Sequence, residues 1–307
     1  MGRSPGMVLA ICCVSMVVVV MDISIVNVAL PAIRHDLHAT TQGLQWTVDA
    51  YTLVLGCFLV LAGSTADRVG RRRVFQVGLA AFGVGSLLCG VAPGIGWLIA
   101  ARAVQALGGT MLNPVAMAII ANTFTEPAAR ARAIGVFGAL AGLPLALGPI
   151  LGGVLVDSFG WRSVFFVNVP IVAIAIVGAA LFVPESRAAR ARRFDPVGQV
   201  LVVLLLGSVV YAIIESRSVW LLGAAVLAVV GILFYEPRRA DPLLELRLFR
   251  SVSFGSAILV ALLAMCGFSS FLFVTVMSLD IVHICVRSSF TFWAVVGSRG
   301  WGRGRVV

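Results

Sequence analysis

GSTADRVGRRRVF, at Gly63–Phe75, is a short charged stretch between two long apolar runs. It contains Asp67, Arg68 and three consecutive Arg residues at 71–73. Such a stretch cannot lie in hydrocarbon, so it must turn at a membrane face. Short loops rich in Arg are retained on the cytoplasmic side of a membrane. The stretch therefore predicts both a membrane-embedded chain and its orientation.

The composition of the 307 residues agrees with this interpretation. Hydrophobic residues make up 60% and charged residues 12%, whereas soluble domains carry about 25% charged residues. The net charge of +10 comes from Arg alone, in short loops without an aromatic-interleaved basic face, so we expect no nucleic-acid partner. The six Cys residues form no CxxC pair and the His residues show no ligand spacing, so we expect no metal and no cofactor.

A helix needs about 20 apolar residues to cross the hydrocarbon core. This rule predicts an all-α membrane protein with spans near 7–31, 46–66, 74–92, 97–121, 132–156, 162–184, 197–215, 218–236 and 252–279, and a weaker apolar patch at 281–297. With a cytoplasmic N-terminus, the outer loops carry only Arg34, Arg162 and Arg217, while the remaining loop Arg residues lie inside. This asymmetry predicts a multi-pass protein of the cytoplasmic membrane with its N-terminus in the cytoplasm.

Two charges lie within predicted spans. Asp22 is about 22 Å from the cytoplasmic end of the first span and Arg102 is about 8 Å into the fourth from outside, at 1.5 Å per residue. Both therefore lie at similar heights in a core about 30 Å thick. A lone charge at mid-helix costs about 2.5–3.5 kcal/mol, so such groups face a cavity or each other. A stabilising pair and a carboxylate that takes and releases a proton, with an Arg that tunes its pKa, are compatible interpretations.

Other polar residues are candidates for a translocation path. Asp49, beside Trp46 and Tyr51 near the outer start of the second span, either is solvated or lines such a path. Gln105 and Asn27 are further candidates for the path. No GxSxG, HExxH or P-loop pattern is found, so we expect neither an enzyme with catalytic residues nor an ATP-driven pump on this chain.

The span 132–156 is rich in Gly and contains Pro144 and Pro149. Gly residues four apart let a neighbouring helix approach closely. Each proline removes a backbone donor, so a bend is expected. Simple packing explains GxxxG spacing alone, but two prolines in one span indicate a moving part or a cavity wall.

Six segments carry a family resemblance, namely the four motifs below and the connecting segments WRSVFFVNVP at 161–170 and DPLLELRLFR at 241–250. Gly63–Phe75 resembles the signature loop of the major facilitator superfamily, with matches at Gly63, Asp67, Arg68, Gly70, Arg71 and Arg72. MDISIVNVALP at 21–31 is similar to the first-helix motif of the fourteen-helix drug:proton antiporters, whose acidic residue falls on Asp22. LIAARAVQALGG at 98–109 resembles their helix-four motif. The segment 135–153 resembles their antiporter motif of helix five, with matches at Gly135, Gly148, Pro149, Gly152 and Gly153.

This resemblance implies two six-helix lobes around a central cavity, with two linking helices between them. It divides the chain into an N-terminal lobe at 1–186, linking helices with cytoplasmic loops at 187–250, the first helix of an incomplete C-terminal lobe at 251–280, and an atypical tail at 281–307. It also implies export of small lipophilic or cationic substrates across the cytoplasmic membrane in exchange for protons, so the expected partners are the lipid bilayer, the substrate and protons. Asp22 would bind the proton, and Arg102 would tune the proton affinity of that carboxylate. The charged loop with Asp67 and Arg68 would hold the cytoplasmic ends of the lobes together.

The resemblance stops after Val276, and we expect a truncation or a frame shift near 277–281. A non-transporting remnant, or a single lobe that binds without cycling, is therefore the alternative function. A facilitator for sugars or metabolites is a third hypothesis, which Asp22 and the helix-five motif disfavour. The sequence leaves the substrate and the oligomeric state open.

Overall fold

The structure, a computed structural model, describes residues 4–188, 195–215 and 219–235, and also 238, 251, 254–256, 258–260, 262–264 and 267. Backbone contacts divide the chain into two compact units, Met1–Leu244 and Glu245–Val307. The first unit contains helices α1 to α9. The described residues of the second unit are mostly short helical pieces.

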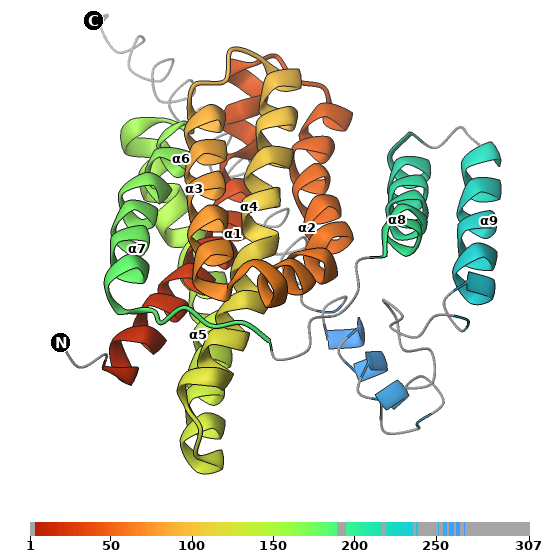
Figure 1. The fold of residues 1–307 in the computed structure, drawn as a ribbon. Coiled ribbons are helices and arrows are strands. Elements are labelled where there is room, and N and C mark those ends of the chain that lie inside the picture. Colours follow the sequence, from red (N-terminus) through yellow and green to blue (C-terminus); the bar gives the residue numbers. More distant parts are fainter. Residues whose placement is uncertain are drawn as a thin grey trace, which may run out of the picture. The chain divides into compact units, whose positions relative to one another are not determined.

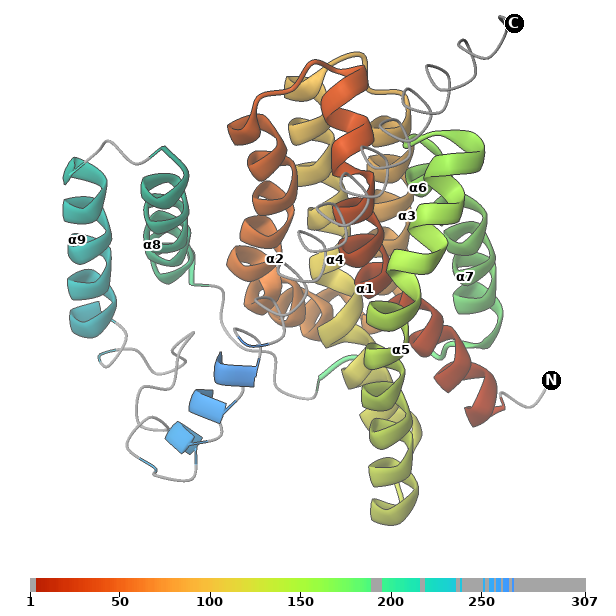
Figure 2. The same cartoon turned by 180° about the vertical axis from the view of Figure 1, so that it is seen from behind.

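The first unit begins with a bundle of helices that run up and down in turn (Figure 1). Its members are α1 (Pro5–Asp36), α2 (Thr41–Val69), α3 (Arg71–Gly90), α4 (Ile95–Thr123), α5 (Pro127–Phe159), α6 (Ser163–Phe166) and α7 (Asn168–Phe182). Figure 2 shows α1 running through the middle of this bundle. Two further helices, α8 (Pro196–Glu215) and α9 (Val219–Tyr235), pack on each other, and α8 also contacts α2.

Among the described residues, seven helices are long and apolar enough to cross a membrane, with α6 and α7 taken as one span. The all-α membrane fold expected from the sequence is therefore confirmed, and the first eight predicted spans correspond to α1–α5, α6 with α7, α8 and α9. The ninth span, near 252–279, lies only partly within the described residues. The patch at 281–297, the tail at 281–307 and the segment 277–281 lie outside them.

The sixth predicted span, 162–184, corresponds to α6 and α7, which together count as one membrane span at Ser163–Phe182. A one-residue break at Val167, which keeps right-handed helical dihedrals, separates α6 from α7. Pro170 explains the break, because it has no N–H to donate to the carbonyl of Phe166. The interruption gives Asn168 a place at the very start of α7.

Helices α3 and α4 pack backbone to backbone because facing positions carry glycine. A Cβ at Gly108 would meet the backbone of Phe82, and a Cβ at Gly85 would meet the backbone of Gln105. Such close approach through small residues is the usual way that membrane helices associate. It fixes the height of α4 against α3, and with it the height of Arg102.

The antiporter segment of α5 has two different faces. Gly148 and Gly152 face α1, because a Cβ at Gly148 would meet Ser24 and a Cβ at Gly152 would lie 3.2 Å from the Cβ of Val28. Gly135, Gly138, Gly142 and Gly153 have no atom within 4 Å of an added Cβ. Only part of this glycine pattern therefore packs within the bundle.

Gly108→Ala is predicted to destabilise the bundle by about 1–3 kcal/mol, because the new methyl group must displace backbone atoms of α3. Gly96→Ala is the matched control, since it lies on the same helix with no atom within 4 Å of an added Cβ. Thermal unfolding in detergent measures both variants. Equal midpoints for the two variants would contradict the described α3–α4 contact.

Candidate functional site

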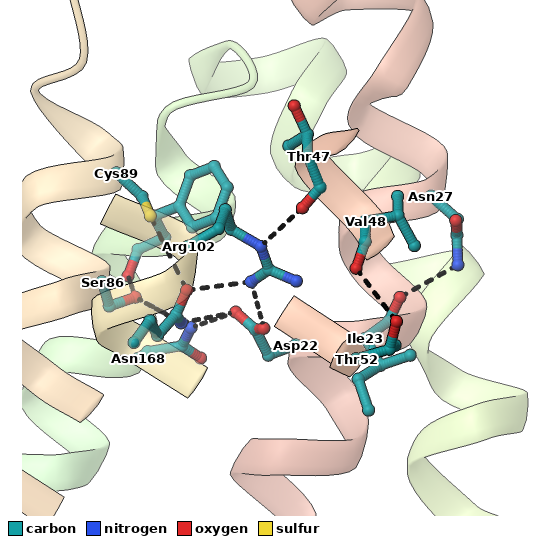
Figure 3. A network of polar contacts seen from close by, with 12 residues as sticks. Asp22, Ile23, Asn27, Thr47, Val48, Thr52, Ser86, Cys89, Arg102 and Asn168 are labelled. Atoms are coloured by element: carbon teal, nitrogen blue, oxygen red, sulfur yellow. Dashed lines mark hydrogen bonds and ion pairs between the residues drawn. The ribbon is translucent and has the colours of Figure 1, made fainter. Parts of the chain in front are cut away.

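The centre of the bundle contains an ion pair between Asp22 on α1 and Arg102 on α4. Nη1 of Arg102 lies 2.5 Å from Oδ2 of Asp22. Both residues are 1% exposed. Figure 3 shows the two side chains pointing toward one another. The structure therefore brings together the two charges that the sequence placed at similar heights.

Two amide side chains complete the coordination of the Asp22 carboxylate. Its Oδ1 accepts hydrogen bonds from Nε2 of Gln105 at 2.8 Å and from Nδ2 of Asn168 at 3.1 Å. Ser86 on α3 joins the two amides, because its Oγ lies 3.3 Å from Gln105 Nε2 and 3.0 Å from Asn168 Nδ2. The Ser86 hydroxyl in turn donates to the carbonyl of Phe165 at 2.8 Å. Both carboxylate oxygens thus have partners from other helices.

The Arg102 guanidinium is held by α2 as well as by Asp22. Its Nε donates to the carbonyl of Thr47 at 3.2 Å, and its Nη1 donates to Oε1 of Gln105 at 2.8 Å. The guanidinium carbon also lies 4.1 Å from the centre of the Tyr51 ring, a cation–π contact. Arg suits such a place because its planar fork donates in several fixed directions and stacks on aromatic rings.

Four members of this polar cluster were not candidates in the sequence, namely Thr47, Tyr51, Ser86 and Asn168. Of these, only Tyr51 was noted, as a neighbour of Asp49. The signal available for Asn168 was a single amide in the apolar run that follows Trp161. Its position at the α6–α7 interruption directs it to Asp22 (Figure 3). Ser86 gave no such signal, because a lone serine in a membrane helix is common.

Two predicted path residues lie outside the cluster. Asn27 is exposed, and its Nδ2 donates to the carbonyl of Ile23 on its own helix at 3.0 Å. Asp49 is half-buried on α2. Gln105, the third candidate, belongs to the cluster as described above. That any of them lines a translocation path remains a prediction.

The charged stretch at Gly63–Phe75 turns within a single residue. Gly70, at φ 128°, ends α2 and precedes α3 directly, so Asp67 and the Arg run lie in helices and not in the loop that the sequence predicted. Charged side chains at helix ends reach the membrane surface, which permits this arrangement. Nη2 of Arg71 lies 2.9 Å from Oδ1 of Asp67, and Nη1 of Arg71 donates to the carbonyl of Ala118 at 3.4 Å.

Glu185, which sequence analysis did not single out, covers this turn from the segment after α7. Its Oε1 accepts from the backbone N–H of Arg72 at 3.2 Å, and its Oε2 lies 3.6 Å from Nε of Arg73. The backbone N–H of Arg71 also donates to the carbonyl of Ser186 at 2.9 Å. A carboxylate at the start of α3 is stabilised by the unpaired N–H groups there.

The opposite end of the bundle has its own polar contact. Oδ2 of Asp36, at the end of α1, accepts from Nε1 of Trp161 at 2.9 Å and from Nη1 of Arg162 at 2.6 Å. Arg162 also donates to the carbonyl of Ala92 at 3.3 Å. This contact ties the turn before α6 to the ends of α1 and α3.

The central cluster offers charge pairing and hydrogen bonding. Within the described residues, no group of three or more His, Cys, Asp or Glu side chains could hold a metal ion. Among the described buried polar residues around Arg102, Asp22 carries the acidic side chain. Its carboxylate is the charge that balances Arg102.

Arg102→Ala is predicted to lower the free energy of unfolding by about 3–5 kcal/mol, because it leaves the Asp22 carboxylate buried without a cation. The double variant Asp22→Asn/Arg102→Ala should be more stable than Arg102→Ala, because neither charge remains. Thermal unfolding in detergent at neutral pH measures the difference. If the double variant were the less stable of the two, the two charges would not stabilise each other.

Glu185→Ala is predicted to loosen the α2–α3 turn by about 1 kcal/mol, the scale of a partly exposed ion pair. Trypsin should then cleave severalfold faster at the Arg residues of the turn, as mass spectrometry of the fragments would show. Glu126→Ala removes an exposed carboxylate before α5 and is the matched control. Similar cleavage in the two variants would mean that Glu185 does not protect the turn.

Comparison with known proteins gives concordant matches. The family model described as Major Facilitator Superfamily matches residues 12–198. Multidrug resistance protein Stp of Mycobacterium tuberculosis is 37% identical over 266 residues, which are 84% of this chain and 50% of that protein. Puromycin resistance protein pur8 of Streptomyces alboniger is 40% identical over 265 residues, covering 84% of this chain and 53% of that protein.

A third relative, the multidrug efflux pump LfrA of Mycolicibacterium smegmatis, is 37% identical over 281 residues, which are 89% of this chain and 56% of that protein. The chain thus spans about half the length of the curated relatives it matches.

Solved structures show the same fold. The human organic anion transporter MFSD10 (TETRAN) matches 76% of this chain and 62% of its own, with a TM-score of 0.53 and 16% identity. The peptide transporter PepTSo matches 75% of this chain and 52% of its own, with a TM-score of 0.54 and 15% identity. The family model covers more than half of the sequence, and the spanning helices are those of a multi-pass membrane protein. The chain therefore belongs to the Major Facilitator Superfamily.

Proposed function

We propose that this protein exports small lipophilic or cationic drugs across the cytoplasmic membrane in exchange for protons, by alternating access to a central site. The observation that carries the proposal is the buried Asp22–Arg102 pair with its amide partners. Ionisable groups within membrane spans are costly and are retained at proton and substrate pathways. Relatives named as multidrug resistance and efflux proteins support the class of substrate.

Protonation of Asp22 is the proposed switch. With Asp22 ionised, the carboxylate balances Arg102 and binds Gln105 and Asn168, so α1, α4 and α7 are held together. With Asp22 protonated, the guanidinium keeps its charge and loses its counter-ion, so the same helices are held less tightly. A proton therefore biases the bundle between two arrangements, which is what coupling to transport requires.

A cationic substrate can use the same carboxylate. Substrate and proton would compete for Asp22, so that arrival of one releases the other. The enclosure of Asp22 at 1% exposure fits a state in which neither side has access. Export then needs a second arrangement in which the site opens to the cytoplasm, and a third in which it opens outward.

The other motifs have roles in this proposal that follow from their positions. The α2–α3 turn with Asp67, Arg71 and Glu185 would latch the cytoplasmic ends of the lobes. The open glycine face of α5 would contact the second lobe and resist leak. The concentration of Arg at this end of the bundle supports a cytoplasmic N-terminus. The division at 1–186, 187–250 and 251–280 belongs to the same proposal.

A single lobe that binds substrate without cycling is the second candidate function. The observation that favours it is that the Asp22–Arg102 pair and its amide partners are assembled within one bundle. Alternating access needs two lobes that rock about the site. Binding of a fluorescent cationic dye without efflux from cells that make the 307-residue chain would support this candidate.

Asp22→Asn is predicted to abolish proton-driven efflux of a cationic dye, because the amide cannot take up the transported proton. Inside-out vesicles with an imposed proton gradient measure the uptake of dye and the release of protons. Asp157→Asn, which alters an exposed carboxylate at the end of α5, should retain efflux. Unchanged efflux in Asp22→Asn would remove the proposed coupling site, whatever the substrate.

A further inference from the structure

Ser24 on α1 makes a hydrogen bond that leaves its own helix. Its Oγ donates to the carbonyl of Leu145 on α5, at 3.4 Å. Ser15, a buried serine of the same helix, instead donates to the carbonyl of Cys12 within α1, at 2.7 Å. A serine within a helix commonly bonds a carbonyl of the preceding turn, as Ser15 does. The acceptor chosen by Ser24 therefore needs its own explanation.

The explanation lies in Pro149. In a regular helix the carbonyl of Leu145 accepts from the N–H of the residue four positions later. That residue is Pro149, which has no N–H, so the carbonyl loses its partner in the helix. Prolines are tolerated in membrane helices where serine or threonine side chains satisfy the freed backbone groups. Ser24 supplies the missing donor from a neighbouring helix.

Gly148 makes room for this donor. A Cβ at position 148 would meet Oγ and Cβ of Ser24, so a larger residue would exclude the hydroxyl. The Gly148–Pro149 pair thus acts as a unit, since the proline frees a carbonyl and the glycine admits the side chain that binds it. One turn further along, Gly152 lets α5 approach α1 closely, because a Cβ added at Gly152 would lie only 3.2 Å from the Cβ of Val28.

Ser24 is two residues from Asp22, on the other side of α1. Asp22 faces Arg102, Gln105 and Asn168, whereas Ser24 faces α5. The same turn of α1 is therefore held from two sides by polar contacts. These contacts join α5 at its proline to the same turn of α1 that carries Asp22.

We propose that Ser24 is a positioning residue, which ties the interrupted hydrogen-bond ladder of α5 to the turn of α1 that carries Asp22. Through this bond the protonation state of Asp22 alters the conformation of α5 around Leu145. The second statement rests on the proposed function, in which Asp22 takes up and releases a proton. The bond itself and its dependence on Pro149 do not.

A double-mutant cycle tests the bond, with amide hydrogen exchange of α5 measured by mass spectrometry on the full chain in lipid nanodiscs. Ser24→Ala should speed exchange in the segment 141–153 about threefold, the scale of an interhelical hydrogen bond in a membrane. Ser24→Thr, which keeps the hydroxyl, and Ser15→Ala should match the wild type. In a Pro149→Ala background the new N–H binds the Leu145 carbonyl, so Ser24→Ala should have no further effect.

The coupling has its own readout in the pH profile of the same exchange. At each pH the wild type is compared with Asp22→Asn, which cancels the intrinsic pH dependence of exchange. The difference in exchange rate between the wild type and Asp22→Asn should change with pH. When both proteins also carry Ser24→Ala, this difference should be the same at every pH. A merely structural serine would leave that pH-dependent difference in place.

Three results would overturn the proposal. The first is that Ser24→Ala has no effect on the exchange rate of the segment 141–153. The second is that Ser24→Ala has the same effect in the wild type and in Pro149→Ala. The third is that the exchange difference between the wild type and Asp22→Asn still depends on pH when both carry Ser24→Ala.

Dye efflux separates this proposal from the proposed function. If Asp22→Asn stops dye efflux while Ser24→Ala leaves the hydrogen exchange of α5 unchanged, the Ser24 proposal fails alone. If the exchange results hold and no efflux occurs, the drug-export proposal fails alone.

Discussion

An Arg side chain in the middle of a membrane bundle must find an anion and enough acceptors, because no water is present to supply them. Arg102 imposes this requirement, and much of the bundle meets it. Asp22 brings in α1, the carbonyl of Thr47 brings in α2, and Gln105 adds a second contact from α4 itself. Asn168 then binds the remaining oxygen of Asp22 from α7. The close glycine packing of α3 on α4 sets the height at which these groups meet.

The two ends of the bundle obey the same rule under milder conditions. At the start of α3, Glu185 accepts a hydrogen bond from a backbone N–H group and pairs with an Arg side chain. At the opposite end, Asp36 accepts hydrogen bonds from Trp161 and Arg162. Each contact joins segments that are far apart in the sequence. Because these charges lie near water, the loss of one partner costs less at the ends than at the centre, where the other charge would stay buried.

The sequence predicted features that depend on local composition, and it missed those that depend on how helices are rotated. Span lengths and the meeting of Asp22 with Arg102 followed from hydrophobic length and the cost of lone charges. The sequence did not show that Glu185 covers Gly70, because the partner lies more than a hundred residues away. It also could not show which glycines of α5 face α1, since glycine spacing is the same whichever face is buried. The roles given to all these residues stay predictions.

The unequal hydrophobicity of α1 and α4 bears on how the chain is assembled. The most apolar stretch of α1 is much more hydrophobic than that of α4, so α1 is the better able of the two to enter the bilayer alone. α4 is among the least apolar of the spanning helices, and it carries Arg102. During synthesis α1 emerges first, and an anion is therefore already in place at the correct depth when α4 reaches the membrane. The order of the two charges along the chain thus favours biogenesis, because the less apolar helix of the pair is the one that arrives second.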